Sequence, residues 1–238
     1  MSNSHNFFLD LAKETQQICK DQEYITSDCE VFTLLPLPFY PLPQKLEKGF
    51  ILFEGDMLDA AQQTGIGNVL IFASHRRPGG GWENGKTSQE ESFYYRTDLS
   101  RYGLKRDNEF YTKDQGEKPR QVAGISVFRD SSYSLCEPWL CDFIYLAAPV
   151  VTPDSDPKVV QTRIRKQIQA LADLCVTRRH VVIGPWGCGV YGNDPRFVAS
   201  VFKETFEPLF KASKMDHVVV CLQDDENGKI FKEVFGWK

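Results

Sequence analysis

The sequence predicts a layered α/β fold in which a sheet lies between helices on both of its faces. From residue 50 onward, short apolar runs alternate with helical stretches, which is typical of layered α/β domains. Two of these runs lead directly into glycine-rich loops. The chain has 238 residues, of which 42% are hydrophobic, enough for one substantial core. One domain with an extension is therefore the simplest organisation.

The N-terminal part of the chain differs from the rest. We expect an amphipathic helix over residues 6–21 and a short strand over residues 31–35. Residues 36–43 contain four prolines, which lack N–H donors and restrict the residues before them, so an extended connector is predicted there. Residues 1–49 are thus expected to form a helical extension with a Pro-rich connector, and residues 50–238 the α/β domain.

Strands and helices of the α/β domain are predicted from its apolar patterns. Strands are expected at residues 51–54, 69–73, 124–128, 143–147, 181–183 and 218–222. Helices are expected at residues 57–64, near Ser88, after Asp156-Pro157 and after Asp194-Pro195, the last two with a cap and a proline at the first position. Residues 105–121 are rich in charge and glycine, so we expect a mobile surface loop there.

Charge and composition exclude several classes of protein. A net charge of −4 argues against duplex DNA as a partner. The N-terminus lacks a signal-peptide pattern, and no apolar stretch is long enough to span a membrane. Seven cysteines form neither a disulfide framework nor a C-x₂-C pair. We therefore expect an intracellular protein, cytoplasmic or nuclear, with no metal or other cofactor.

The first glycine-rich loop covers residues 76–82 and follows the strand predicted at residues 69–73. Its three consecutive glycines, Gly79, Gly80 and Gly81, carry no Cβ, so backbone N–H groups can approach a ligand closely. A diphosphate site needs such a backbone. A plain flexible turn accounts for an isolated glycine triplet equally well.

The second glycine-rich loop covers residues 184–195 and also follows a predicted strand. Asn193 or Asp194 can cap the next helix, with Pro195 at its first position. A glycine-rich loop that opens into a helix N-terminus binds anions, because loop amides and helix dipole act together. The alternative is a tight turn, but four glycines between residues 184 and 192 are more than a turn needs. A ligand site is therefore favoured.

Residues 87–91, Thr-Ser-Gln-Glu-Glu, lie between the two loops and have two interpretations. Ser88 as N-cap and Glu91 three residues later fit a capping box, and Thr87 with Glu90 fits another. The pattern alone favours this structural role. Adjacent glutamates on a helix project about 100° apart, so a catalytic pair would divide its work between an acid/base and a positioning group.

Taken together, these motifs resemble the poly(ADP-ribose) glycohydrolase family. The string from Gly79 to Glu91 is similar to the family signature, Gly-Gly-Gly followed by Gln-Glu-Glu, and residues 72–81 and 187–195 resemble the compact microbial-type branch. The resemblance implies a three-layer α/β/α macrodomain with a central mixed sheet. It also implies a glycosidase-type hydrolase that cuts the ribose–ribose O-glycosidic bond of ADP-ribose polymers and releases ADP-ribose. ADP-ribose, poly(ADP-ribose) and ADP-ribosylated proteins are the implied partners.

The resemblance implies a role for each matching residue. Glu91 corresponds to the catalytic acid/base, Glu90 to the glutamate that holds the ribose hydroxyls, and Gln89 to a residue that orients them. Asp56 would accept a hydrogen bond from the adenine amino group, with Glu54 as the alternative residue for this role. The other implied substrate-binding residues are Gly79, Gly80, Gly81 and Ser74 at the diphosphate and distal ribose, and Gly187, Cys188, Gly189, Val190, Tyr191 and Gly192 around the diphosphate, with Tyr191 shielding the distal ribose.

Two positions depart from the family pattern. Ser74 stands where related sequences usually carry asparagine, and Ile71 where they carry a polar residue, so we expect distal-ribose recognition and substrate preference to differ from the family pattern. Two other functions therefore stay open: a macrodomain that binds ADP-ribose without cleaving it, and a hydrolase of mono-ADP-ribosyl or related derivatives. A pure binding module has no need of two glutamates at the reacting carbon, so the glycohydrolase is favoured.

Several residues near the loops have plainer interpretations. His75, Arg76 and Arg77 are expected to be solvated at the rim of the site. Cys188 is expected to be a small buried residue instead of a nucleophile. The two tryptophans beside the glycine runs, Trp82 and Trp186, either stack on the ligand or anchor their loops.

Overall fold

The structure is a computed structural model that describes residues 2–21 and 46–238, so the strand and connector expected at residues 31–35 and 36–43 lie outside the described residues. Its strands are β1 (Gly49–Glu54), β2 (Asn68–Phe72), β3 (Arg120–Arg129), β4 (Leu135–Leu146), β5 (His180–Ile183) and β6 (His217–Leu222). Its helices are α1 (Ser2–Asp21), α2 (Met57–Thr64), the 3₁₀ helix η1 (Trp82–Asn84), α3 (Gln89–Arg96), α4 (Leu99–Tyr102), α5 (Glu109–Thr112), α6 (Pro157–Cys175), α7 (Pro195–Lys211) and α8 (Glu226–Phe235).

The described strands form a six-stranded sheet in the order β1-β6-β5-β2-β4-β3. Neighbouring strands are parallel except β3 and β4, which pair antiparallel, so the sheet is mixed as expected. The five parallel strands therefore end at one edge of the sheet. Open α/β sheets bind ligands at the carboxyl ends of their strands. Both glycine-rich loops leave the sheet at this edge.

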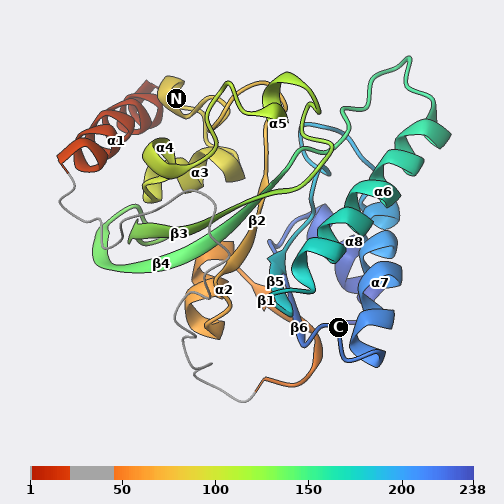
Figure 1. Cartoon of the computed structure of the whole chain (residues 1–238). Helices are drawn as coiled ribbons and strands as arrows, with labels where there is room; N and C mark the ends of the chain where they lie inside the picture. Colours follow the sequence, from red (N-terminus) through yellow and green to blue (C-terminus); the bar gives the residue numbers. More distant parts are fainter. Residues whose placement is uncertain (1, 22–45) are drawn as a thin grey trace.

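Helices cover both faces of the sheet, which confirms the layered arrangement (Figure 1). α6, α7 and α8 pack side by side on one face, and α2 packs against β2, β5 and β6 from the other. The central strands are buried on both sides, because the side chains of residues 69–71 and 181–183 are fully buried. Continuous apolar runs are what a parallel sheet covered on two faces requires.

Helix α1 is packed into the domain. Leu11 and Ala12 are buried in the main core. The hydroxyl of Thr15 donates to the carbonyl oxygen of Tyr95 at 2.9 Å, and the ring of Phe8 lies 5.3 Å from the Tyr95 ring. Figure 1 shows α1 beside α3 and α4. The N-terminal helix therefore covers the outer side of the helix that carries the two candidate glutamates.

The mobile surface loop expected at residues 105–121 lies mostly at the surface, but it contains helix α5 and the start of β3. Asn108 caps α5 by accepting from the N–H of Phe110, and the ring of Phe110 is fully buried, 6.1 Å from the ring of Tyr145. β3 already begins at Arg120. The buried ring of Phe110 thus attaches α5 to the core within a segment whose charge and glycine content suggest a loop.

Other element boundaries follow from caps and burial. Asp156 and Asp194 cap α6 and α7 by accepting from the N–H groups of Lys158 and Arg196, which confirms both predicted starts. β4 begins at Leu135, well before the predicted strand, because its first half is only partly buried and carries no continuous apolar run. Helix α8 was not predicted, since its first residues are polar.

Candidate active site

A cavity of about 640 Å³ lies at the carboxyl edge of the sheet. Its walls come from residues that follow the parallel strands and from the first half of α3. They include residues 55–57, Ser74, Gly80, residues 87–93, residues 185–187 and residues 189–191. The segments singled out by the sequence therefore meet around one hollow.

Gln89 fixes the start of α3 against the sheet. Its Oε1 accepts from the N–H of Phe72 at 2.9 Å, and its Nε2 donates to the carbonyl oxygen of Leu70 at 2.9 Å. The side-chain amide thus pairs with β2 much as another strand would. Because the side-chain amide of Gln89 bonds to β2, Gln89 affects Glu90 and Glu91 by positioning the helix that carries them.

Glu90 is buried, with 3% of its surface exposed, and both of its carboxylate oxygens accept backbone hydrogen bonds. Oε2 accepts from the N–H of Ser74 at 2.6 Å and Oε1 from the N–H of Gly79 at 2.9 Å. Burial raises the pKa of Glu90 well above its usual value, and the nearby Glu91 adds to this, whereas the two N–H groups oppose it. Glu90 is therefore held rigidly at the end of β2.

Glu91 offers one oxygen to the protein and one to the cavity. Its Oε1 accepts from the N–H of Gly81 at 2.8 Å. Within residues 2–21 and 46–238, no hydrogen bond reaches its Oε2, and Glu91 lines the cavity. A carboxyl oxygen in this position can exchange a proton with a bound molecule.

The capping interpretation of Glu91 is wrong in this structure. Ser88 occupies the N-cap position of α3, but its side chain makes no capping hydrogen bond. The carboxylate of Glu91 turns to the N–H of Gly81 instead of the N–H of Ser88. The sequence has the spacing of a capping box, but the carboxylate of Glu91 accepts a hydrogen bond from the glycine loop instead.

Gly80 lies where the two carboxylates converge. A Cβ at Gly80 would come within 2.4 Å of Oε1 of Glu91 and 3.4 Å of Oε2 of Glu90. Its φ of +55° is also in the left-handed region. Glycine is therefore needed at this position for both reasons.

The N–H groups of the first loop are already engaged. Those of Gly79 and Gly81 donate to Glu90 and Glu91, and that of Gly80 donates to the carbonyl oxygen of Arg77 at 3.3 Å. The expectation that this loop supplies free amides for a diphosphate is therefore wrong. Of the three glycines, only Gly80 lines the cavity.

The second loop has the free amides that the first one lacks. Among the described residues, no acceptor is bonded to the N–H groups of Gly187, Gly189, Val190 or Tyr191. The loop is held from behind, because the side-chain amide of Asn193 donates to the carbonyl oxygens of Pro149 and Gly187 at 2.8 and 2.9 Å. Successive free N–H groups on a fixed loop form an anion site.

Tyr191 connects the second loop to the end of β2. Its half-buried hydroxyl lies 3.4 Å from the carbonyl oxygen of Ala73 and 3.5 Å from Nδ1 of His75. Its ring lines the cavity near Ser74, whose Oγ accepts from the N–H of Arg76 at 3.1 Å. The two loops therefore close around the same space.

The two acidic candidates for the adenine differ in their surroundings. Asp56 lines the cavity and caps α2 by accepting from the N–H groups of Leu58 and Asp59. Glu54 is absent from the lining, and its exposed carboxylate pairs with Lys232 on α8. The structure therefore brings Asp56 and not Glu54 to the site.

The remaining singled-out residues have structural roles. Trp82 is buried outside the cavity lining and anchors its loop. Trp186 is fully buried in the cavity wall, where its indole N–H donates to the carbonyl oxygen of Leu146 at 2.8 Å and anchors the second loop. Burial raises the pKa of Cys188 to about 12, which leaves its thiol protonated and a poor nucleophile. Ile71 is fully buried in β2. Gly192 turns the loop back with a φ of +69°.

Sequence reasoning missed two residues of α3. The hydroxyl of Tyr95 donates to the carbonyl oxygens of Trp82 and Lys86, which fixes the connection between the glycine loop and α3. Arg96 is a buried cation that contacts Asp56. An arginine in the last turn of a helix usually complements the helix dipole, so its position gave no signal of burial.

Neither a metal cluster nor a membrane helix is found in the part of the chain that the structure describes. No group of three or more His, Cys, Asp or Glu side chains there could hold a metal ion. No described helix is both long and apolar enough to cross a membrane.

Comparison with solved structures gives the class of the fold. The chain matches poly(ADP-ribose) glycohydrolase from Thermomonospora curvata with a TM-score of 0.75 and 23% identity, over 97% of this chain and 98% of that one. The same enzyme bound to the inhibitor ADP-HPD gives a TM-score of 0.73 at 23% identity, over 97% and 98%. Poly(ADP-ribose) glycohydrolase from Deinococcus radiodurans in complex with ADP-ribose gives 0.67 at 22% identity, over 80% and 85%. The chain therefore has the macrodomain-like fold of these proteins.

A shorter segment of the chain also matches a protein family in sequence. Residues 45–130 match the family model for the microbial-type PARG, catalytic domain. This segment contains the first glycine loop and all of α3. No curated protein sequence matches the chain. The resemblance to microbial-type poly(ADP-ribose) glycohydrolases is thus confirmed, in sequence over this segment and in fold over 97% of the chain.

Proposed function

We propose that the chain is a poly(ADP-ribose) glycohydrolase that hydrolyses the ribose–ribose O-glycosidic bond and releases ADP-ribose. The observation that carries this proposal is the position of Glu91, which lines the cavity with Oε1 held by Gly81 and with no hydrogen bond to Oε2 among the described residues. The match to a microbial-type PARG catalytic domain and the shared fold support a glycosidase-type hydrolase.

In this proposal the two glutamates divide the work. The carboxyl of Glu91 donates a proton to the leaving oxygen while the ribosyl carbon develops oxocarbenium character, and the resulting carboxylate then activates a water molecule. Glu90, with both oxygens held by backbone N–H groups, positions the ribose hydroxyls. Gln89 does not contact the substrate in this proposal and instead positions both glutamates by holding α3 on β2.

The rest of the cavity fits the other parts of ADP-ribose. The free N–H groups of the second loop would bind the diphosphate, and Cys188 and Gly192 shape that loop. Gly80 and Ser74 would lie against the distal ribose beside Tyr191. Gly79 and Gly81 act through the carboxylates that they hold. Asp56 would accept from the adenine amino group.

We also propose how the chain is organised and where it acts. Residues 50–238 would carry the complete ADP-ribose site, with α1 packed on the outer side of α3 as a brace. The odd number of cysteines without framework spacing supports a reducing compartment, the cytoplasm or the nucleus.

Two alternatives would use the same cavity: binding without cleavage, and hydrolysis of mono-ADP-ribosyl derivatives. Incubation of the protein with labelled poly(ADP-ribose) and, separately, with a mono-ADP-ribosylated protein decides among the three. Release of ADP-ribose from the polymer is expected. Release only from the mono-ADP-ribosylated protein, or binding with no release at all, would contradict the proposal and favour one of the alternatives.

A further inference from the structure

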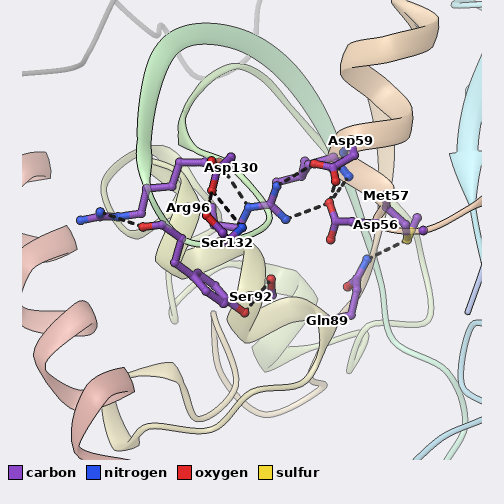
Figure 2. A network of polar contacts seen from close by, with 12 residues as sticks. Asp56, Met57, Asp59, Gln89, Ser92, Arg96, Asp130 and Ser132 are labelled. Atoms are coloured by element: carbon purple, nitrogen blue, oxygen red, sulfur yellow. Dashed lines mark hydrogen bonds and ion pairs between the residues drawn. The ribbon is translucent and has the colours of Figure 1, made fainter. Parts of the chain in front are cut away.

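Arg96 holds the start of α2 to the end of α3. Its side chain is 2% exposed, and Nη1 donates to Oδ1 of Asp56 at 2.8 Å. Nη2 donates to Oδ1 of Asp59 at 3.4 Å, and Nε to the carbonyl oxygen of Arg129 at 3.3 Å. Figure 2 shows the guanidinium joined by dashed lines to both aspartates. A buried guanidinium needs hydrogen-bonding and charged partners, and its planar, rigid N–H groups fix the orientation of the carboxylates that accept from it.

The two oxygens of Asp56 are used differently. Oδ1 accepts from the N–H groups of Leu58 at 2.8 Å and Asp59 at 3.1 Å in addition to Arg96. Among residues 2–21 and 46–238, no donor is bonded to Oδ2, and Asp56 lines the cavity. Oδ2 is therefore an acceptor available to a ligand, and Arg96 fixes the plane in which it lies.

The chemistry of Oδ2 selects one part of ADP-ribose. A carboxylate repels the diphosphate, so it will not lie against that group. The exocyclic amino group of adenine is an N–H donor and suits a carboxylate acceptor. A base with a carbonyl oxygen at the same position would place two acceptors together, which is unfavourable.

Helix α3 connects this acceptor to the two glutamates. Its first residue, Gln89, donates to Sδ of Met57 at 3.2 Å, and its last residue, Arg96, contacts Asp56 (Figure 2). Glu90 and Glu91 lie between these two contacts. One short helix therefore carries the two glutamates and also contacts the acidic residue of the cavity wall.

We propose that Arg96 is a positioning residue that sets the base selectivity of the site. It holds Oδ1 of Asp56, so that Oδ2 points to the amino group of adenine, and it keeps this acceptor in register with the glutamates on α3. The inference rests on the proposed function, because it takes ADP-ribose as the occupant of the cavity.

The test compares the affinities of two probes by calorimetry: ADP-ribose, and inosine diphosphate ribose, in which a carbonyl oxygen replaces the adenine amino group. The wild-type protein should prefer ADP-ribose by about tenfold or more. Arg96→Gln should lose most of this preference. Asp59→Ala is the matched control, because it removes the longer contact of Arg96 at a residue outside the cavity lining and should keep the preference.

A double-mutant cycle separates positioning from folding. Asp56→Asn alone should lower the preference for ADP-ribose, and adding Arg96→Gln should then change it little, because both substitutions act through the same oxygen. If Arg96→Gln does not fold, Arg96→Lys serves instead. The lysine keeps a buried cation but is too short to reach the Nη1 position, so the preference of this variant for ADP-ribose should also fall.

An unchanged preference in a folded Arg96 variant would overturn the inference and leave the proposed function intact. A wild-type protein that binds both probes equally would do the same. Failure of the wild-type protein to bind either probe would overturn both. The polymer assay, which does not depend on Arg96, reports on the proposed function separately.

Discussion

The N–H of Gly81 donates to Oε1 of Glu91 at 2.8 Å, and that of Gly79 donates to Oε1 of Glu90 at 2.9 Å. The first glycine loop and helix α3 thus hold each other in place. The loop positions the carboxylates through its backbone, and the second loop keeps free N–H groups for an anion.

Gly80→Ala should reduce turnover strongly. The added methyl group would lie 2.4 Å from Oε1 of Glu91, so the carboxylate must move, and a misplacement of this size costs about 10²-fold in rate. The left-handed φ of Gly80 should also cost about 1–2 kcal/mol of stability.

Gly236→Ala is the control for Gly80→Ala. Gly236 has a φ of +80°, and a Cβ added there would meet nothing within 4 Å, so the substitution carries the backbone cost without the contact. Polymer hydrolysis and thermal unfolding should show both variants destabilised and only Gly80→Ala slowed by about 10²-fold. Normal turnover by a folded Gly80→Ala enzyme would show that the carboxylates are not fixed as described.

Tyr95→Phe should lower kcat about tenfold while ADP-ribose affinity stays nearly unchanged. The variant removes the donor to the carbonyl oxygens of Trp82 at 2.7 Å and Lys86 at 2.8 Å, which loosens the segment between Gly81 and Glu91. Tyr94→Phe is the neighbour control, since among the described residues the Tyr94 hydroxyl pairs only with that of Tyr145, at 2.9 Å. Equal loss of kcat in both variants would point to general destabilisation.

The sequence predicted the central sheet because its strands are buried on both faces and therefore read as continuous apolar runs. The caps of α6 and α7 were equally clear, since a capping aspartate followed by proline is typical of a helix start. Phe110 was not recognised as a core residue, because nothing local distinguishes an aromatic ring that fills a core from one in a loop.

The sequence predicted which residues form the site more fully than it predicted their hydrogen bonds. Ser88 and Glu91 have the spacing of a capping box, and the same spacing also serves a catalytic glutamate. Only the tertiary position of Gly81 decides between them. The direction of the loop amides, toward the carboxylates and not toward a ligand, depends on the same long-range contact. A local pattern does not contain this information.

The stability of the protein should depend on the protonation of Asp98. Burial raises the pKa of Asp98 from 3.8 to about 7 in the folded protein. The stabilising effect of its neutral form is therefore complete below pH 3.8 and is lost as the pH rises through about 7. Asp98→Asn removes this dependence, because asparagine cannot ionise.

Urea unfolding of the wild-type protein and of Asp98→Asn at pH 5 and pH 8 tests this dependence, on either side of the folded pKa near 7. Relative to the variant, the wild-type protein should lose free energy of unfolding between the two pH values. The same difference between the proteins at both pH values would mean that Asp98 does not titrate in this range.

The central claim is that Glu91 exchanges the proton that cleavage requires. Glu91→Gln keeps an oxygen that accepts from the N–H of Gly81, so the loop and the fold should be preserved. The most direct measurement is hydrolysis of labelled poly(ADP-ribose) by this variant beside the wild-type enzyme, with ADP-ribose binding and thermal unfolding as controls. We predict normal folding, affinity close to wild type and a loss of at least about 10²-fold in rate. Near-normal turnover by Glu91→Gln would contradict the account.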